Sequence, residues 1–469
     1  MNTDTQPIGS VTRDLTDYLV NLSYADVPEE VLERERWHTL DTLGCILYGS
    51  TTPWVRKVIA ALDEMGESGN ASVLGTDASF SPARAALANG TASHSMDFDD
   101  YCQDAGVHAG SATVTTALAY ADAAAEPVSG REFLTAVAAG VETSIRTGYG
   151  IGRGSLLHGW HIAGWTGAFG AAATTGVLTG LPQARMSHAL ALAGTQGAGL
   201  MGAAYGSEVK RFHMGKAAES GYLGAALAKH DFTGDTHIFE ERWGSIGMTM
   251  SEDYDPEAVT ADLGSKYELL EKLSFKPYPS TGQCHPPTDA LAEILDSHNL
   301  VDGDVANVTI RLTEAAKEKA GWPYEPIDVM SAQANMQYPL GALLVDGEIT
   351  IESYTVEAVA RPAVLDAIRD RIDLVVDDAL EVGDPSYARY NTVAEVTTVD
   401  GQDYNAEMSI PRGFPQNPMS KSELTEKFRQ QASYVLDDAA TQACIDFVLS
   451  IDEHDDVSNL IDIINRGRI

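Results

Sequence analysis

The stretches SATVTTALAYADAAA (residues 111–125) and AAESGYLGAALAK (residues 217–229) predict the architecture of most of this chain. Both are rich in alanine, the best helix former, and poor in bulky side chains. Small side chains let neighbouring helices approach closely, so these segments predict a dense helical bundle. Residues 31–48 add an amphipathic pattern, with candidate core positions at Leu32, Leu40, Leu43 and Ile46. We find few convincing strands before residue 270.

The pattern changes after Lys276-Pro277-Tyr278-Pro279. Residues 305–312 alternate between apolar and polar side chains, which predicts a strand, and residues 336–345 indicate a helix. Residues 392–398 and 404–410 flank an Asp-Gly pair, which is typical of a β-hairpin turn. This part of the chain therefore predicts a smaller α+β unit.

Helical character returns after Pro418, where Ser420 and Glu423 have the spacing of a capping box. The order along the chain is thus helical, α+β, helical. We expect a mainly α protein with a large, discontinuous all-helical domain, residues 1–270 and 411–469. The smaller α+β domain, residues 271–410, would be inserted into it or cap it.

The charge of the chain bears on partners and habitat. Its 469 residues include 31 Lys and Arg against 68 Asp and Glu, a net charge of −37. Such a field repels nucleic acid and anionic membranes, and we expect neither as a partner. Good apolar periodicity argues against disorder. The acidic surface instead suggests a protein from the salt-loaded cytoplasm of a halophile, since salt screens self-repulsion.

Cysteine usage and apolar runs point to the same compartment. The four cysteines are widely spaced, which favours reduced cytoplasmic thiols over a disulfide scaffold or a zinc ribbon. The N-terminus is polar and lacks the pattern of a signal peptide. Residues 162–184 are uncharged and long enough to span a bilayer, but they are only weakly apolar. A buried helix is therefore a better interpretation than a membrane span.

One segment concentrates groups that could do chemistry. Residues 89–108 contain two imidazoles, His94 and His108, and several carboxylates, of which Asp97 is the first. Carboxylates and imidazoles held close together serve either proton transfer or metal binding. Asp99, Asp100 and Asp104 resemble the Mg²⁺-binding aspartates of helical terpenoid synthases, although no second metal motif follows. A solvated acidic loop is the alternative.

Three further segments carry scarce basic groups. In His158-Gly-Trp-His161, two imidazoles three residues apart could share a helix face and bind a metal, or one could act as acid or base. The run Lys210-Arg211-Phe212-His213 could attract an anion or form a surface ion pair. Lys276 lies at the predicted domain junction, where small-molecule pockets tend to form, or in a plain linker. The chain shows no P-loop, dinucleotide fingerprint or nucleophile elbow.

Segments spread over nearly the whole chain resemble the MmgE/PrpD family, which includes dehydratases of 2-methylcitrate, decarboxylases of cis-aconitate and epimerases of iminodisuccinate. The matching segments are Asp41–Gly44, Asn89–Asp100, His158–Ala173, Gly194–His213, Gly215–Gly221, Phe232–Gly234, Lys276–Pro279 and Asn417-Pro418. The resemblance implies a helical domain with an α+β lid, a homodimer, and neither a nucleotide cofactor nor, as a rule, a metal. It places the family's catalytic residues at Asp97, His108, His161, Lys210 and Lys276.

The family reactions share removal or addition of a proton on carbon next to a carboxylate. We therefore expect Lys210 and Lys276 to bind substrate carboxylates, the two imidazoles to exchange protons, and Asp97 to orient a histidine or act as an acid. Further candidates for substrate binding are Tyr101, Arg211, His213 and Thr281.

The chain also departs from the family. Tyr101-Cys102-Gln103 replaces the usual residues after the Asp-Asp pair, Ala109 replaces proline, and Thr281 stands where decarboxylases would carry histidine. We therefore expect a hydro-lyase resembling 2-methylcitrate dehydratase, an enzyme of propionate metabolism. The alternatives are a dicarboxylate epimerase or isomerase, a cis-aconitate decarboxylase, a Mg²⁺-dependent terpenoid synthase, and a non-catalytic binding protein.

Overall fold

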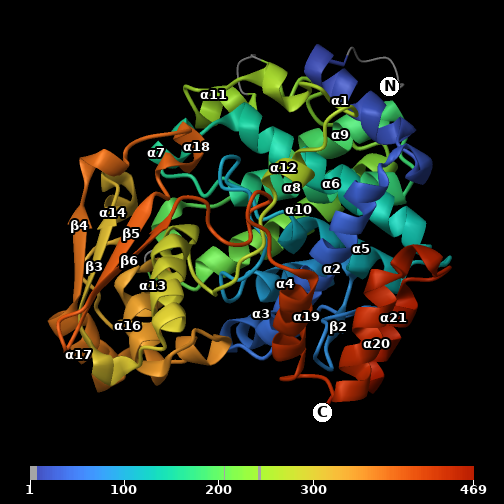
Figure 1. The fold of residues 1–469 in the computed structure, drawn as a ribbon. Coiled ribbons are helices and arrows are strands. Elements are labelled where there is room, and N and C mark those ends of the chain that lie inside the picture. Colours follow the sequence, from blue (N-terminus) through green and yellow to red (C-terminus); the bar gives the residue numbers. More distant parts are fainter. Residues whose placement is uncertain (1–7, 205, 241–244) are drawn as a thin grey trace.

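A computed structural model describes residues 8–204, 206–240 and 245–469. It is mainly α with a smaller α+β part, as predicted (Figure 1). The helical part comprises α1 Ser10–Asn21, α2 Glu29–Ser50, α3 Pro53–Glu64, α4 Pro82–Ser93, α5 Gly110–Ala123, α6 Gly130–Ile151, α7 Gly154–Leu157, α8 Ala163–Leu178, α9 Gln183–Gly194, α10 Val209–Lys229, α11 Ile246–Met250, α12 Glu268–Lys272, α19 Lys421–Ala432, α20 Asp438–Leu449 and α21 Ser458–Arg466, with the short strands β1 Ala71–Ser72 and β2 Ser79–Phe80.

Small side chains set the close packing of the helical part. Helix α10 packs against α4, α8 and α9. Gly90 of α4 faces Gly215 of α10 so closely that a Cβ on Gly90 would lie 2.8 Å from the Gly215 Cα. Only glycine allows this approach, which brings the first turn of α10 toward the residues that follow α4.

The uncharged run at residues 162–184 forms the buried helix α8, as predicted. None of the helices in the described part of the chain is long and apolar enough to cross a membrane.

The α+β part is built on one four-stranded sheet in the order β4-β3-β5-β6. Strands β3 and β4 are parallel, and the other pairs are antiparallel. Its elements are β3 Val305–Leu312, β4 Ile372–Val376, β5 Thr392–Thr398, β6 Asp403–Met408, α13 His285–His298, α14 Glu314–Ala320, α15 Val329–Ala334, α16 Gln337–Asp346, α17 Pro362–Arg371 and α18 Pro385–Ala388. Strand β3 and the hairpin of β5 and β6 confirm the sequence prediction, and Gly401 has the positive φ of 84° that the turn needs.

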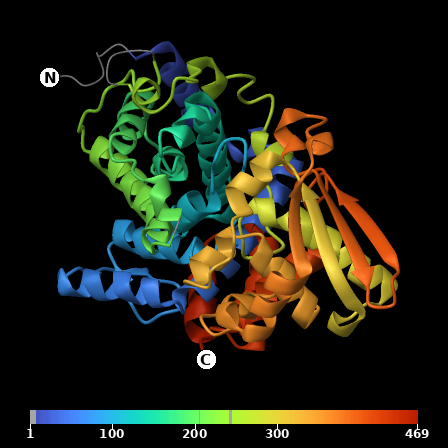
Figure 2. The ribbon, with the colours of Figure 1, turned by 90° about the vertical axis from the view of Figure 1, so that its left-hand side faces the viewer.

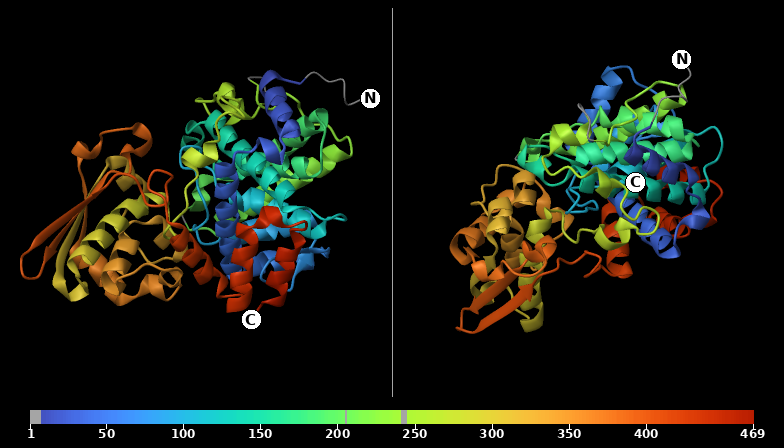
Figure 3. Two further views of the ribbon diagram at one scale, coloured as in Figure 1. Left: turned by 45° about the vertical axis from the view of Figure 1, so that its right-hand side comes forward. Right: turned by 90° about the horizontal axis from the view of Figure 1, so that it is seen from above.

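The sheet lies at the outer edge of the molecule, with α13 and α16 between it and the helical part (Figures 1 and 3). A separate apolar core, which includes Val308, Ile310, Leu340 and Ala394, joins the sheet to these helices.

The C-terminal helices return to the helical part and lie against it away from the sheet (Figure 3), whereas Figure 2 views the molecule from the side of the sheet. Helices α19 and α20 pack against α2, and Phe428 and Ile445 share a core with Leu40. The predicted capping box is confirmed: the Ser420 hydroxyl accepts a hydrogen bond from the Glu423 amide at 3.2 Å, and the Glu423 carboxylate accepts one from the Ser420 amide at 2.7 Å.

Candidate active site

A cavity of about 650 Å³ lies between the helical part and α14 of the α+β part. All five residues predicted to be catalytic line it, and so do Tyr101 and Thr281; the five are Asp97, His108, His161, Lys210 and Lys276. A smaller cavity of about 60 Å³ shares Asp97, Lys210 and Thr281 with it and is also lined by Arg211. His213 lines neither cavity among the described residues.

Asp97 joins the two lysines. Lys276 Nζ donates to Asp97 Oδ1 at 2.6 Å and to the Asp97 carbonyl at 2.9 Å, while Lys210 Nζ donates to Oδ2 at 3.0 Å. Burial opposes the charge of Asp97, but the two lysines outweigh it and hold the pKa of this carboxyl well below its usual range. Asp97 is therefore ionised. Its carboxylate holds two ammonium groups, and these contacts fit an anchor for the lysines better than the predicted roles as an acid or as the orienting partner of a histidine.

The backbone around Asp97 is arranged for this contact. Asp97 has a φ of 53°, in the left-handed region that a non-glycine residue seldom occupies and that costs roughly 1–2 kcal/mol. Arg211 Nε donates to the Ser95 carbonyl at 3.0 Å, and Gln333 Nε2 of α15 donates to the Met96 carbonyl at 2.7 Å. Arg211 Nη2 in turn donates to Gln333 Oε1 at 2.6 Å. The α+β part thus helps to hold the turn that carries Asp97.

His108 presents one defined nitrogen to the cavity. Its Nδ1 lies 2.8 Å from the Asp100 carbonyl and 3.3 Å from Asp99 Oδ2, and both of these atoms are acceptors. Nδ1 therefore carries a proton, which leaves Nε2 as the ring nitrogen that can accept one. The side chain lines the cavity and is 15% exposed.

Asp99 also holds His94, which is buried behind His108. His94 Nδ1 lies 2.9 Å from Asp99 Oδ2, and the Ser111 hydroxyl donates to the same oxygen at 2.7 Å. Burial lowers the pKa of His94 to about 4, so this ring is neutral. The donor atoms of His94, Asp99 and His108 lie within 4.8 Å of one another and could hold a metal ion. The Nδ1 atoms of both histidines already contact Asp99, and an ion bound through these atoms would have to displace the contacts.

The three aspartates that resembled a Mg²⁺ motif face different partners. Asp99 binds the two imidazoles just described. Asp100 accepts from the amides of Ala109 and Gly110 and lies 3.2 Å from His38 Nε2. Asp104 pairs with Arg389 at 2.8 Å and with Lys272 at 3.5 Å. The contacts do not form a shared Mg²⁺ site, so the terpenoid synthase interpretation loses its basis.

His161 is paired with His213. Their Nδ1 atoms lie 3.0 Å apart, so one of them donates and the other accepts. Burial and the charge of Lys210 hold the pKa of His161 well below its usual range, and they also lower that of His213. His161 is therefore neutral, and His213 lies where it can set the tautomer of His161.

His158 and His161 do not share a helix face, and that prediction is wrong. Helix α7 ends at Leu157, and Gly159 has a φ of 84°, which breaks the helix between the two histidines. His158 is exposed and its Nδ1 lies 3.1 Å from the Met250 carbonyl, whereas His161 is buried.

Tyr101 and Thr281 border the same cavity. The Lys276 Nζ lies 5.2 Å from the centre of the Tyr101 ring. The Tyr101 hydroxyl is buried without a hydrogen-bond partner among the described residues, and burial raises its pKa well above its usual range. The hydroxyl therefore keeps its proton, and the residue borders the cavity. Thr281 donates its amide to the Gln333 carbonyl at 2.8 Å and stays half-buried.

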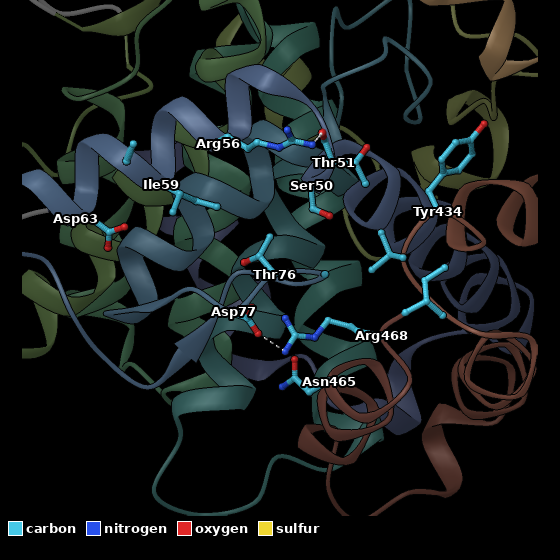
Figure 4. Close-up of a pocket in the computed structure, with 14 residues that line it drawn as sticks. Ser50, Thr51, Arg56, Ile59, Asp63, Thr76, Asp77, Tyr434, Asn465 and Arg468 are labelled. Carbon is cyan, nitrogen blue, oxygen red and sulfur yellow. Dashed lines mark hydrogen bonds and ion pairs between the residues drawn. The ribbon is translucent and has the colours of Figure 1, made fainter.

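Another cavity, of about 700 Å³, lies where α2 and α3 meet the C-terminal residues (Figure 4). Arg56 and Arg468 line it; Arg56 donates to the Thr51 carbonyl, and Arg468 pairs with Asp77, both at 2.6 Å. Among the described residues that line it there is neither a histidine nor a lysine. It lacks the acid and base groups of the first cavity, which is therefore the candidate active site.

Sequence reasoning missed two residues at this site. Lys319 of α14 lines both cavities, and Gln333 of α15 contacts Arg211 and the Met96 carbonyl. The scarcity of lysine in the chain was a signal for Lys319, but in the sequence it lies in an ordinary charged helix. Gln333 has no local signal, because its contacts cross between the two parts of the fold.

Fold and cavity together define a mainly helical protein with a histidine, lysine and carboxylate site between two parts. Family comparison agrees: the MmgE/PrpD N-terminal domain model matches residues 13–257, and the MmgE/PrpD C-terminal domain model matches residues 278–453. The chain belongs to the MmgE/PrpD family.

Its relatives include proteins named for one reaction. The chain is 30% identical to the cis-aconitate decarboxylase-like protein oryM of Aspergillus oryzae, over 99% of both chains. It is 29% identical to cis-aconitate decarboxylase of Aspergillus terreus, over 98% of this chain and 97% of that one. It is 28% identical to human cis-aconitate decarboxylase, over 96% and 94% of the two chains.

Proposed function

We propose that this protein is a lyase that removes a proton from carbon next to a carboxylate of a small di- or tricarboxylate. We propose dehydration of a hydroxy-tricarboxylate resembling 2-methylcitrate as the net reaction. The observation that carries the proposal is the single cavity in which Asp97 fixes two ammonium groups and which the imidazoles of His108 and His161 also line.

The lysines bind the substrate's carboxylates and stabilise the negative charge that develops on them. Asp97 neutralises only one of the two ammonium groups of Lys210 and Lys276, so that one positive charge remains for an anion. Lys276 is 2% exposed, and in such a water-poor site a fixed ammonium stabilises an enolate-like oxygen strongly. The Tyr101 hydroxyl supplies a further donor.

His108 is the base. Its Nδ1 is committed to the Asp100 carbonyl, so Nε2 accepts the α-proton as the C–H bond breaks. The electron pair of that bond forms the carbon–carbon double bond, and the C–O bond to the hydroxyl breaks.

The hydroxyl leaves as water and needs a proton. Burial lowers the pKa of Lys210 by more than Asp97 raises it, which makes this ammonium a better acid than an ordinary lysine. Lys210 donates the proton, and the neutral His161 hydrogen-bonds the leaving oxygen.

Decarboxylation of cis-aconitate is the second candidate, favoured by the names of the relatives. In that reaction a carbon–carbon bond to a carboxylate breaks, carbon dioxide leaves, and an acid protonates the α-carbon. Thr281 at a cavity position where a decarboxylase would carry histidine argues for dehydration instead. Epimerisation of a dicarboxylate would use the same base without loss of a group.

The test is a panel of di- and tricarboxylates incubated with the protein in concentrated salt in D₂O and followed by proton NMR. The expected result is exchange of an α-proton together with loss of water from a hydroxy-tricarboxylate. Loss of carbon dioxide from cis-aconitate would replace dehydration by the second candidate. Absence of exchange with every acid of the panel would contradict catalysis and favour a binding protein.

Variants of two histidines in one segment test the site. We expect His161→Gln to lower turnover by roughly 10²-fold or more, in the range of general acid–base contributions. His158→Gln is the matched control, since this exposed side chain lies outside the lining of the cavity. Equal turnover of the two variants would contradict the assignment.

A further inference from the structure

Lys319 is a cation in the candidate site without a counter-charge. It lies on α14 of the α+β part and lines both the large and the small cavity. Among the described residues, its Nζ has neither an ion-pair nor a hydrogen-bond partner. Lys210 and Lys276, by contrast, both bind Asp97.

An ammonium group that is half-buried and unpaired destabilises its surroundings, and a bound anion would offset this cost. Burial already lowers the pKa of Lys319, and the distant charge of Asp97 only partly opposes this. Lys317, two residues earlier, shows that a lysine on α14 can have a hydrogen-bond partner. Its Nζ turns to the sheet, where it donates to the Leu374 carbonyl of β4 at 3.3 Å.

The small cavity has the size and charge of a carboxylate subsite. Its volume of about 60 Å³ holds a few water molecules, or one carboxylate group in their place. The cations around it are Lys210, Arg211 and Lys319, against the single carboxylate of Asp97. Arg211 uses two of its donors on Ser95 and Gln333, so it contributes mainly a fixed positive charge.

We propose that this small cavity is a subsite for a distal carboxylate of the substrate and that Lys319 binds this group. The inference rests on the proposed function and deepens it. A substrate held through one carboxylate by Lys210 and Lys276, and through another by Lys319, needs carboxylates on separate carbons. The site then prefers acids with two or more carboxylates to monocarboxylates of the same chain length.

Isothermal calorimetry with unreactive ligands tests this preference. Propane-1,2,3-tricarboxylate and pentanoate share a five-carbon chain, and only the first carries carboxylates in addition to the one at a chain end. We expect the wild-type protein to bind the tricarboxylate at least tenfold more tightly. Lys319→Met should weaken tricarboxylate binding roughly tenfold to hundredfold, as for loss of one hydrogen bond to a charged group, and should change pentanoate binding much less, because pentanoate has no second carboxylate.

Lys317→Met is the matched control and should bind both ligands as the wild type does. Lys319→Arg should keep most of the preference because it retains the charge. It also guards against a misfolded Lys319→Met variant. Unchanged preference in Lys319→Met, or equal weakening for both ligands, would overturn the inference.

Kinetics separate this inference from the proposed function. If the wild type exchanges no α-proton with any acid of the panel, the proposed function is wrong, whatever the calorimetry shows. If the wild type is active but Lys319→Met keeps its KM for tricarboxylates, the inference alone is wrong. The inference predicts that Lys319→Met raises KM and changes kcat little. This pattern shows the loss of a contact that binds substrate and transition state equally.

Discussion

Asp97→Asn should disable the site while leaving the fold intact. The substitution removes the negative charge that Lys210 and Lys276 share, but it keeps a side-chain oxygen and the backbone carbonyl that also binds Lys276. Without the shared carboxylate the two ammonium groups repel each other and move apart. A displacement of about 1 Å at a reacting centre costs roughly 10²-fold in rate, and we expect turnover to fall by at least that factor.

The loss of stability follows from burial. Breaking a buried ion pair costs about 3–5 kcal/mol, and the retained acceptors place Asp97→Asn near the lower end, about 3 kcal/mol. An unfolding entropy of about 2.1 cal/mol/K per residue amounts to about 1 kcal/mol/K for the whole chain. The midpoint of thermal unfolding should therefore fall by only about 3 °C, and the variant should remain folded at 25 °C.

Asp104→Asn is the matched control. Asp104 also meets two cations, Arg389 and Lys272, but its side chain is 22% exposed against 9% for Asp97. A more exposed pair contributes about 1 kcal/mol or less. We expect a midpoint within about 1 °C of the wild type at that energy, with turnover preserved. Equal losses of stability and turnover in the two variants would refute the reasoning.

The pH dependence gives a second check on Asp97. Its folded pKa lies well below the ordinary 3.8. Its contribution is therefore fully present above pH 3.8 and is lost as the pH falls through the folded pKa. The difference in unfolding free energy between wild type and Asp97→Asn should be the same at pH 7 and pH 5. A difference that closes between these values would show that Asp97 is not held ionised.

Three further changes have distinct expected outcomes. The pKa of His94 is about 4 in the folded protein against an ordinary 6.5, so the unfolded chain takes up the proton first as the pH falls. The free energy of unfolding of the wild type should therefore drop by about 3 kcal/mol from pH 6.5 to pH 4. Urea unfolding of His94→Gln should lack this drop. Gln333→Leu removes the bond to the Met96 carbonyl and leaves the Nη2 of Arg211 without its acceptor, which should cost about 1–3 kcal/mol in urea unfolding; an unchanged midpoint would contradict the contact. Ser420→Ala removes a helix cap and should cost about 1 kcal/mol without changing turnover, and a loss of turnover would show that α19 does more than support the fold.

Most of the fold could be predicted from local sequence patterns, because each pattern acts over only a few residues. The alternation in residues 305–312 and the cap at Ser420 both appear where they were predicted. The alanine-rich segments form α5 and the second half of α10, since small side chains favour helix and close packing wherever they lie in the chain. The prediction for His158 and His161 failed because it ignored Gly159, whose backbone turns left-handed and separates them.

The chemistry of the site was visible in the sequence as residue types, and only the tertiary structure decided their roles. Asp97 and Lys276 lie 179 residues apart in the chain, so their ion pair cannot be predicted from local pattern. That contact makes Asp97 an ionised anchor for lysines, where the sequence suggested an acid. The unpaired position of Lys319 likewise depends on how α14 is placed over the helical part. Side-chain identity sets which groups can ionise, whereas burial and neighbouring charge, both products of folding, decide which of them do.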